Sequence, residues 1–264
     1  MPISIAMVAL NSESNSTLSA RDIQRDLKFN WPLLPRAEHT EEKDVTLSFR
    51  LGTADVIIAR MPAPVPWSDL EGPCSTSWLW PDAATVLRQH AAHLIVTVSG
   101  ELSPLKRARI LTQIIASIIG TCKSAVGVYW GDATLVISPP VFREFAVQMA
   151  HDGLPVYIWV DFRVGRNQDG SCSGFTTGLK ALGHMEFETL NSPEQPGELR
   201  ERLFGLACYV LQNGPVIKDR DTVGEDANER IRVVFAESSF GHRGKVMRLE
   251  YGNASSRKPW WKVW

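Results

Sequence analysis

A β-rich run followed by an apolar helix occurs twice in this chain, and this order limits the folds that the chain can adopt. In the first copy, the run Leu94–Val98 precedes Ser103 and Pro104, which are typical of the first residues of a helix. Apolar residues then recur at intervals of three and four as far as Gly120. This spacing predicts a helix with one broad apolar face that lies against a sheet.

The second copy has the run Met185–Leu190 and a helix predicted from about Glu198 to Gly214. Elsewhere the pattern is that of hairpins: Val45–Arg50 and Ala54–Met61 are β-branched runs on either side of a short loop with a glycine. Helices together with hairpins favour the α+β class, with helices packed on a mainly antiparallel sheet.

The order of elements over residues 3–98 is β-α-β-β-α-β, which resembles the split βαβ plan known as ferredoxin-like. The second copy raises the alternative that this plan is duplicated. Three further segments carry local predictions. Residues 36–44 are expected to form a charged loop, residues 62–81 a long ordered loop because of their prolines, and residues 156–164 a strand.

A length of 264 residues allows one domain or two. We expect a single compact α+β domain over residues 1–251, with two similar halves, 1–100 and 101–251, as the alternative. Residues 252–264 are rich in tryptophan and lack periodicity, which predicts a tail.

Composition and charge exclude several classes of protein. A hydrophobic fraction of 44%, a charged fraction of 22% and a net charge of −1 are typical of a globular protein, and they argue against a generic nucleic-acid binder. No apolar run approaches the ~20 residues of a membrane span, so no membrane association is predicted. The first ten residues lack the pattern of a signal peptide, and the four cysteines form no C-x-x-C pair. We therefore expect a cytoplasmic protein.

One group of polar residues is a candidate for catalysis or metal binding. In the segment 184–188, His184, Glu186 and Glu188 alternate with Met185 and Phe187. Alternate residues of a strand share one face, so these three side chains form an acid/base set or a ligand set if the face is enclosed. The sequence favours a different interpretation, in which the face is solvated and Met185 and Phe187 point into the core.

Other candidates for chemistry are weaker. His90 and His93 have a spacing suited to a metal on a helix, but no third ligand is evident, and residues 219–230 depart from a calcium loop at two ligand positions. A catalytic role for Cys172 depends on a base that the sequence does not identify. No motif for a nucleophile, a nucleotide or a phosphate is present. The sequence therefore predicts no cofactor and no metal, and it favours a protein without enzymatic activity.

Tryptophan is the residue type that most suggests binding. Two groups of three are candidate contacts for a partner, because tryptophan is enriched at the centres of protein interfaces. The alternative is that these rings cover the core of their own domain. The candidates are Trp67, Trp78 and Trp80 in the proline-rich segment and Trp260, Trp261 and Trp264 in the tail.

Several segments carry a resemblance to a known family, and together they span roughly residues 45–251. They are Ser77–Trp80, His93–Val98, Gly127–Gly131, Leu154–Arg163, Phe175–Leu179, Leu182–His184, Asn213–Pro215 and Asp221–Gly224. In these segments the chain resembles the bacterial "domain of unknown function 4261" family. The resemblance implies a bacterial intracellular protein, and it assigns no catalytic residues.

The function expected from these observations is binding to another bacterial protein. The resemblance implies an immunity or accessory factor whose partner is a cognate toxin, such as one delivered by type VI secretion. The alternative is a hydrolase-like or metal-dependent enzyme that uses the face with His184, Glu186 and Glu188. The sequence leaves the identity of the partner and the oligomeric state open.

Overall fold

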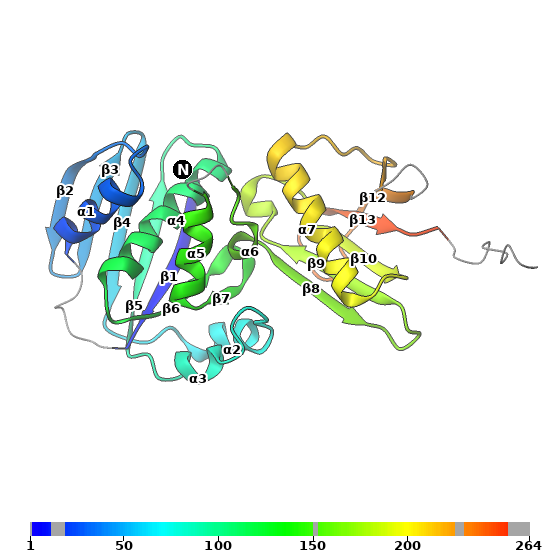
Figure 1. The fold of residues 1–264 in the computed structure, drawn as a ribbon, viewed down its shortest axis with the longest axis horizontal. Coiled ribbons are helices and arrows are strands. Elements are labelled where there is room, and N and C mark those ends of the chain that lie inside the picture. Colours follow the sequence, from blue (N-terminus) through cyan, green and yellow to red (C-terminus); the bar gives the residue numbers. More distant parts are fainter. Residues whose placement is uncertain (1, 12–18, 150–152, 225–229, 253–264) are drawn as a thin grey trace, which may run out of the picture. The chain divides into compact units, whose positions relative to one another are not determined.

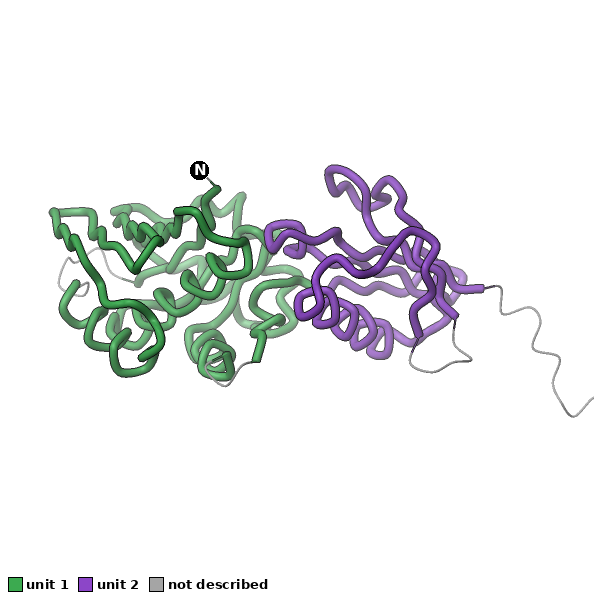
Figure 2. The backbone as a smooth tube through the Cα atoms, turned by 90° about the horizontal axis from the view of Figure 1, so that it is seen from above, with its two compact units in different colours: residues 1–161 green, residues 162–264 purple. Residues whose placement is uncertain are grey.

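The computed structural model describes residues 2–11, 19–149, 153–224 and 230–252, and it divides into two compact units (Figure 2). Unit 1 comprises residues 1–161 and unit 2 comprises residues 162–264. The boundary lies after residue 161, because the helix and strands that follow residue 100 complete the sheet of unit 1. The duplication of the fold stays a prediction. Residues 253–264 of the tail lie outside the described residues.

Unit 1 contains one seven-stranded sheet and most of the helices (Figure 1). Its strands are β1 (Ile3–Leu10), β2 (Ala37–Lys43), β3 (Thr46–Leu51), β4 (Ala54–Met61), β5 (Ala92–Ser99), β6 (Ala125–Trp130) and β7 (Leu135–Ile137). Its helices are α1 (Ala20–Asn30), α2 (Trp67–Ser75), α3 (Ala83–Leu87), α4 (Pro104–Thr121), η1 (Gly131–Ala133), α5 (Pro139–Met149) and α6 (Val156–Trp159).

The strand order of this sheet is β2-β3-β4-β5-β1-β6-β7, and every neighbouring pair is antiparallel. Since β1 is antiparallel to both β5 and β6, those two strands are parallel to each other. The connection β5–α4–β6 is therefore a split βαβ unit that encloses β1. The α+β class with a mainly antiparallel sheet is confirmed. The split unit covers residues 92–130, whereas the split plan was predicted over residues 3–98.

The main core of unit 1 lies between the sheet and α4. Ser103 caps α4 by accepting a hydrogen bond from the amide of Lys106, and Pro104 occupies the first helical position, as predicted. The apolar face of the helix, which includes Leu111 and Ile114, packs on β1 and β5. Helices α1 and α5 pack on either side of α4, so this face of the sheet is covered (Figure 1).

The opposite face of the sheet is only partly covered. A second apolar cluster, which includes Leu70 of α2 and Leu87 of α3, packs beside β6 and β7. Farther along this face, Ile3, Ile5 and Ile57 keep 60%, 37% and 46% of their surface exposed.

Unit 2 contains the second sheet, with strand order β11-β12-β13-β10-β9-β8. The pairs β9–β10, β11–β12 and β12–β13 are antiparallel, and the pair β10–β13 is parallel. Its elements are β8 (Asp161–Arg166), β9 (Cys172–Thr177), η2 (Lys180–Leu182), β10 (Phe187–Ser192), α7 (Pro196–Asn213), β11 (Thr222–Val223), β12 (Ile231–Glu237) and β13 (Lys245–Glu250).

Helix α7 covers one face of this sheet, over β9 and β10. Its buried residues Leu199, Leu203 and Ala207 repeat every four positions, as an amphipathic helix requires. Gly174 of β9 allows the close approach, because a Cβ atom there would lie 3.2 Å from the side chains of both leucines. The helix ends at Asn213 and Gly214 follows it with a positive φ, in agreement with the predicted end.

Three local predictions are wrong. Residues 37–43 form the strand β2 where a loop was expected, because an edge strand exposed on both faces shows no apolar alternation. Residues 67–75 form the helix α2 despite Pro73, which lies near its C-terminal end while Leu70 and Cys74 are buried. Residues 156–159 form a helical turn, α6, and the expected strand begins only at Asp161.

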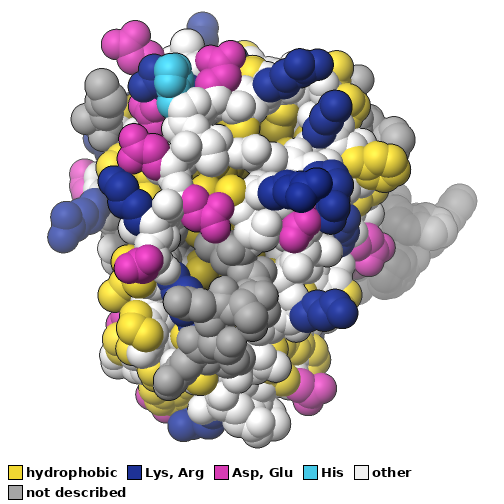
Figure 3. Space-filling model, turned by 90° about the vertical axis from the view of Figure 1, so that its left-hand side faces the viewer, with side chains coloured by type: hydrophobic (Ala, Val, Ile, Leu, Met, Phe, Trp, Pro, Cys, Tyr) yellow, Lys and Arg dark blue, Asp and Glu magenta, His cyan; other side chains and the backbone are white. Residues whose placement is uncertain are grey.

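No helix among the described residues has the length and apolar character needed to span a membrane. On the face shown in Figure 3, basic, acidic and apolar side chains all occur, and none of the three covers the surface alone.

Candidate functional site

Glu186 and Glu188, which were predicted to share one face of a strand, are both buried; Glu188 belongs to β10 and Glu186 lies just before it. Glu186 is 3% exposed and Glu188 is fully buried. The interpretation of a solvated face is therefore wrong for the two glutamates. The reason is that β10 lies in the middle of its sheet, and two connecting segments fold over the carboxylates.

Glu186 binds the segment that follows β9. Its carboxylate accepts hydrogen bonds from the amides of Gly178 and Lys180, both at 2.9 Å, and from the hydroxyl of Thr176 at 2.7 Å. Burial raises the pKa of Glu186, and these hydrogen bonds together with the nearby His242 lower it only in part. All of these donors belong to the chain itself, so the carboxylate fixes the course of residues 176–180.

Glu188 holds the segment between β12 and β13 in a similar way. It accepts a short hydrogen bond from the hydroxyl of Ser238 and one of 2.9 Å from the amide of Ser239. A guanidinium nitrogen of Arg248 lies 3.9 Å from the carboxylate, and it also donates to the hydroxyl of Ser239. This buried carboxylate is therefore paired and hydrogen-bonded, as burial of a charge requires.

His184 is half-buried, and burial lowers the pKa of its imidazole. Within the described ranges, no group of three His, Cys, Asp or Glu side chains is arranged to hold a metal ion. His90 and His93 instead make hydrogen bonds to backbone: His90 accepts from the amide of Val65 at 2.7 Å, and Nδ1 of His93 lies 2.7 Å from the carbonyl of Ala63. Cys172 is buried in β9.

The tryptophans of residues 62–81 are placed differently from one another. Trp67 and Trp80 are partly buried against the cluster of α2 and α3, and the guanidinium of Arg88 lies 3.8 Å from the ring centre of Trp67. Trp78 remains 39% exposed and meets Tyr157 edge to face, with ring centres 5.4 Å apart. Trp67 and Trp80 thus help to cover their own core. Trp260, Trp261 and Trp264 lie outside the described residues.

A groove in unit 1, called here the unit 1 groove, has a volume of about 870 Å³. It lies where the end of α1 and residues 31–35 face the start of α4 and the end of α5. Phe29 and Leu33 at its edge are 83% and 96% exposed. Lys106 and Arg109 also line it, whereas none of the described residues in its lining is Asp or Glu. The groove is thus apolar and cationic.

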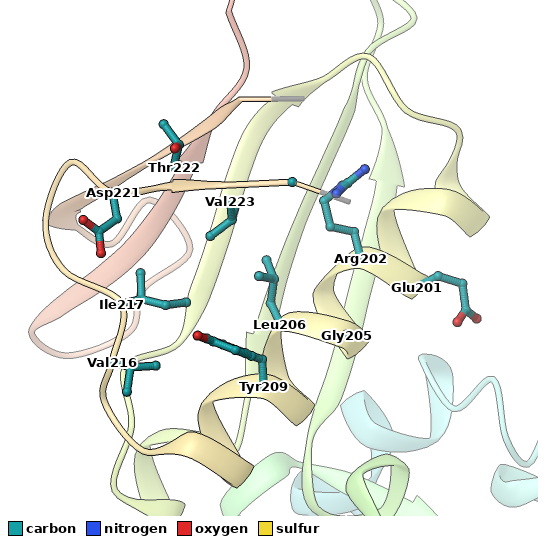
Figure 4. Close-up of a pocket in the computed structure, with 11 residues that line it drawn as sticks. Glu201, Arg202, Gly205, Leu206, Tyr209, Val216, Ile217, Asp221, Thr222 and Val223 are labelled. Carbon is teal, nitrogen blue, oxygen red and sulfur yellow. The ribbon is translucent and has the colours of Figure 1, made fainter. Parts of the chain in front are cut away.

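A second groove, the unit 2 groove, has a volume of about 590 Å³ and lies between α7 and residues 216–224 (Figure 4). Leu206, Tyr209, Ile217 and Val223 point toward its middle in Figure 4. Gly205 adds open space, because no atom outside the helix backbone lies within 4 Å of where its Cβ would be.

The sequence showed neither groove. Phe29 and Leu33 were not candidates, although a run of one tryptophan, two leucines and two prolines over residues 31–35 is an unusual content for an exposed loop. Tyr209 and Val216, which are 49% and 43% exposed, carried no signal that separated them from ordinary helix and loop residues.

Comparison with known families finds a similarity within unit 2. The model of the family described as "Domain of unknown function (DUF4261)" matches residues 175–250. Over these residues the chain is similar to the DUF4261 family. The resemblance predicted from the sequence is thereby confirmed over this range. No curated protein and no solved structure matches the chain.

The DUF4261 match begins in β9 and ends with β13. It contains both buried glutamates, the segments that they bind and the whole unit 2 groove. The unit 1 groove lies outside the matched residues.

Proposed function

We propose that this protein is a binding factor without catalytic activity, and that its partner is another bacterial protein. In the more specific form of the proposal it is an immunity or accessory factor for a secreted toxin. The observation that carries the proposal is the unit 1 groove, where Phe29 and Leu33 expose 83% and 96% of their surface. Contiguous exposed apolar surface with a polar rim is typical of protein interaction sites.

The burial and the hydrogen bonds of Glu186 and Glu188 also support a binding factor without catalytic activity. Glu186 and Glu188 accept hydrogen bonds from backbone amides and hydroxyls of their own unit, which gives each a structural task. The alternative of an enzyme that uses this face would need these carboxylates to reach a substrate, and they are 3% and 0% exposed.

The charge of the unit 1 groove indicates the chemistry of the partner. Lys106 and Arg109 lie beside an apolar surface that lacks acidic groups in its described lining. A partner segment with apolar and acidic side chains complements such a surface, since complementary charge speeds association and excludes other partners.

The test is isolation of a stoichiometric complex between the full chain and a protein from the source bacterium, followed by reconstitution from the two purified components. In the reconstituted complex, the double variant Phe29→Asp/Leu33→Asp is expected to weaken binding at least tenfold, because two exposed apolar contacts are replaced by like-charged groups facing an acidic partner.

Val45→Asp is the matched control, because Val45 is 53% exposed and does not line the unit 1 groove. Calorimetry on the purified components measures all three affinities. Equal affinities for the double variant and the control would contradict a binding role for the groove, and failure to obtain any stoichiometric complex would contradict the proposed function itself.

A further inference from the structure

The unit 2 groove has an apolar middle and an acidic margin. Leu206 lines its middle, and Tyr209 is 49% exposed beside it. Glu201 and Asp221 lie toward opposite sides of the groove in Figure 4. A surface that carries both apolar and cationic side chains therefore complements this groove.

The two carboxylates set the charge of the unit 2 groove, although Arg202 also lines it. The guanidinium of Arg202 lies 2.5 Å from the carboxylate of Glu194, and the two side chains are only 11% and 12% exposed. This pair is neutral as a whole, so it leaves the negative charge of the margin uncompensated.

Unit 1 carries a surface with the complementary properties at the end of α1. The side chains of Phe29 and Leu33, called here the α1 knob, are 83% and 96% exposed and thus project from the surface. The exposed cation Lys28 precedes Phe29, and the exposed Lys106 lies on the other wall of the unit 1 groove.

A smaller cavity next to the unit 1 groove extends the same charge. It shares Trp31 and Pro32 with the groove, and Lys28 and Arg36 lie in its lining. Among the described residues that line either cavity, none is Asp or Glu. The α1 knob is therefore a pair of exposed apolar side chains in cationic surroundings, opposite in charge to the unit 2 groove.

We propose that the α1 knob of one chain binds in the unit 2 groove of a second copy of the chain. The apolar side chains of the knob meet Leu206 and Tyr209, and the cations around it face the carboxylates at the groove's margin. The two surfaces differ, so the contact is heterologous, and association continues beyond the dimer unless a ring closes. The inference goes beyond the proposed function, and where both hold, the partner and the second copy compete for the knob.

Analytical ultracentrifugation of the purified full chain tests the association. One chain has a mass of 29.4 kDa. The weight-average mass is expected to rise above this value as the concentration increases from about 1 to about 100 µM, the range in which interfaces of moderate affinity form. A mass that stays at that of one chain at every concentration would overturn the proposal. It would leave the proposed function standing, because that function is tested on a complex with a different protein.

Two defective variants, measured alone and then mixed, identify the two surfaces. Phe29→Asp/Leu33→Asp alters the knob, and Gly205→Leu fills the open space beside Tyr209. Each variant alone is expected to self-associate at least tenfold more weakly than the natural chain. An equal mixture is expected to form a 1:1 complex, because one variant keeps an intact groove and the other keeps an intact knob.

Each variant has a matched control that keeps the association of the natural chain. Gly197→Leu lies on the same helix as Gly205→Leu, and Gly197 has equally open space but does not line the groove. Val45→Asp places a charge at an exposed apolar residue outside both cavities of the knob. Leucine favours a helix more than glycine does, so neither glycine variant is expected to unfold α7. Equal association of a variant and its control would overturn the proposal, and so would a mixture of the two defective variants that stays monomeric.

Reversal of one charge tests the electrostatic part of the contact. Glu201 is exposed at the margin of the unit 2 groove. Glu201→Lys is expected to weaken self-association at least threefold, because the new cation faces the cations around the knob. Unchanged or stronger association of this variant would contradict the assigned complementarity and overturn the proposal.

Discussion

Replacing Glu186 by alanine is expected to lower the free energy of unfolding by about 3 kcal/mol at pH 7. The change leaves the amides of Gly178 and Lys180 and the hydroxyl of Thr176 without their acceptor in a buried site. A buried donor left unpaired costs roughly 1–3 kcal/mol, and relaxation of residues 176–180 toward water recovers part of that cost. Urea unfolding monitored by circular dichroism measures the difference.

The variant Glu186→Gln separates the charge of Glu186 from its hydrogen bonds. Burial raises the pKa of the carboxyl above its ordinary 4.5, so the folded state favours the protonated form. That contribution to stability is fully present below pH 4.5 and is lost as the pH rises through the raised pKa. Glutamine does not ionise, and its oxygen still accepts from the amides of Gly178 and Lys180.

The stability of Glu186→Gln relative to the natural chain is therefore expected to rise with pH above 4.5 and then level off. Unfolding curves at several pH values from 4.5 to 8 test the sign. A relative stability that falls with pH would show that the folded state favours the ionised carboxylate. A loss of stability for Glu186→Ala no larger than that of an ordinary surface substitution would show that the hydrogen bonds do not hold the segment.

The second large effect is expected at Gly100, between β5 and α4. Its φ is +121°, and a Cβ atom there would lie 2.2 Å from the carbonyl oxygen of Thr53. Gly100→Ala should lower the free energy of unfolding by about 3–4 kcal/mol, because backbone strain adds to a contact that only a shift of the chain relieves. Thr53 and Leu102 line the unit 1 groove, so that shift also deforms one of its walls.

Gly170→Ala is the matched control for Gly100→Ala. Gly170 has a φ of +87°, and nothing lies within 4 Å of where its Cβ would be. Only the left-handed backbone opposes alanine at this position, which costs about 1 kcal/mol. Thermal and urea unfolding of the two variants should therefore differ clearly. If both lose the same stability, the approach of Gly100 to Thr53 is not a rigid feature of the fold.

The parts of the fold that local sequence determines could be predicted. Helix α4 begins at Ser103 and Pro104 as expected, and the hairpin of β3 and β4 has the predicted strands. Strand β2 could not be predicted, because its stability comes from pairing with β3 and its exposed side chains follow no pattern. Helix α2 could not be predicted either, since the burial of Leu70 outweighs the local effect of Pro73.

In the candidate site too, local sequence pattern could be read, whereas contacts with distant parts of the chain could not. Strand alternation drew attention to Glu186 and Glu188, but the groups that bind them come from other segments of the chain. Glu188 is bound by Ser238 and Ser239, which are 50 and 51 residues away along the chain. No spacing in the sequence reports such a contact. The grooves were missed for a related reason, because exposure depends on what the rest of the fold leaves uncovered.

We propose that the exposed apolar surface of unit 1 binds the partner, whereas the buried glutamates maintain the fold. The most direct test is the dissociation constant of the reconstituted complex, measured by calorimetry for Glu186→Gln and for Phe29→Asp/Leu33→Asp. We expect the first variant to bind within about twofold of the natural chain and the second to bind at least tenfold more weakly. Loss of binding for Glu186→Gln with full binding for the double variant would contradict it.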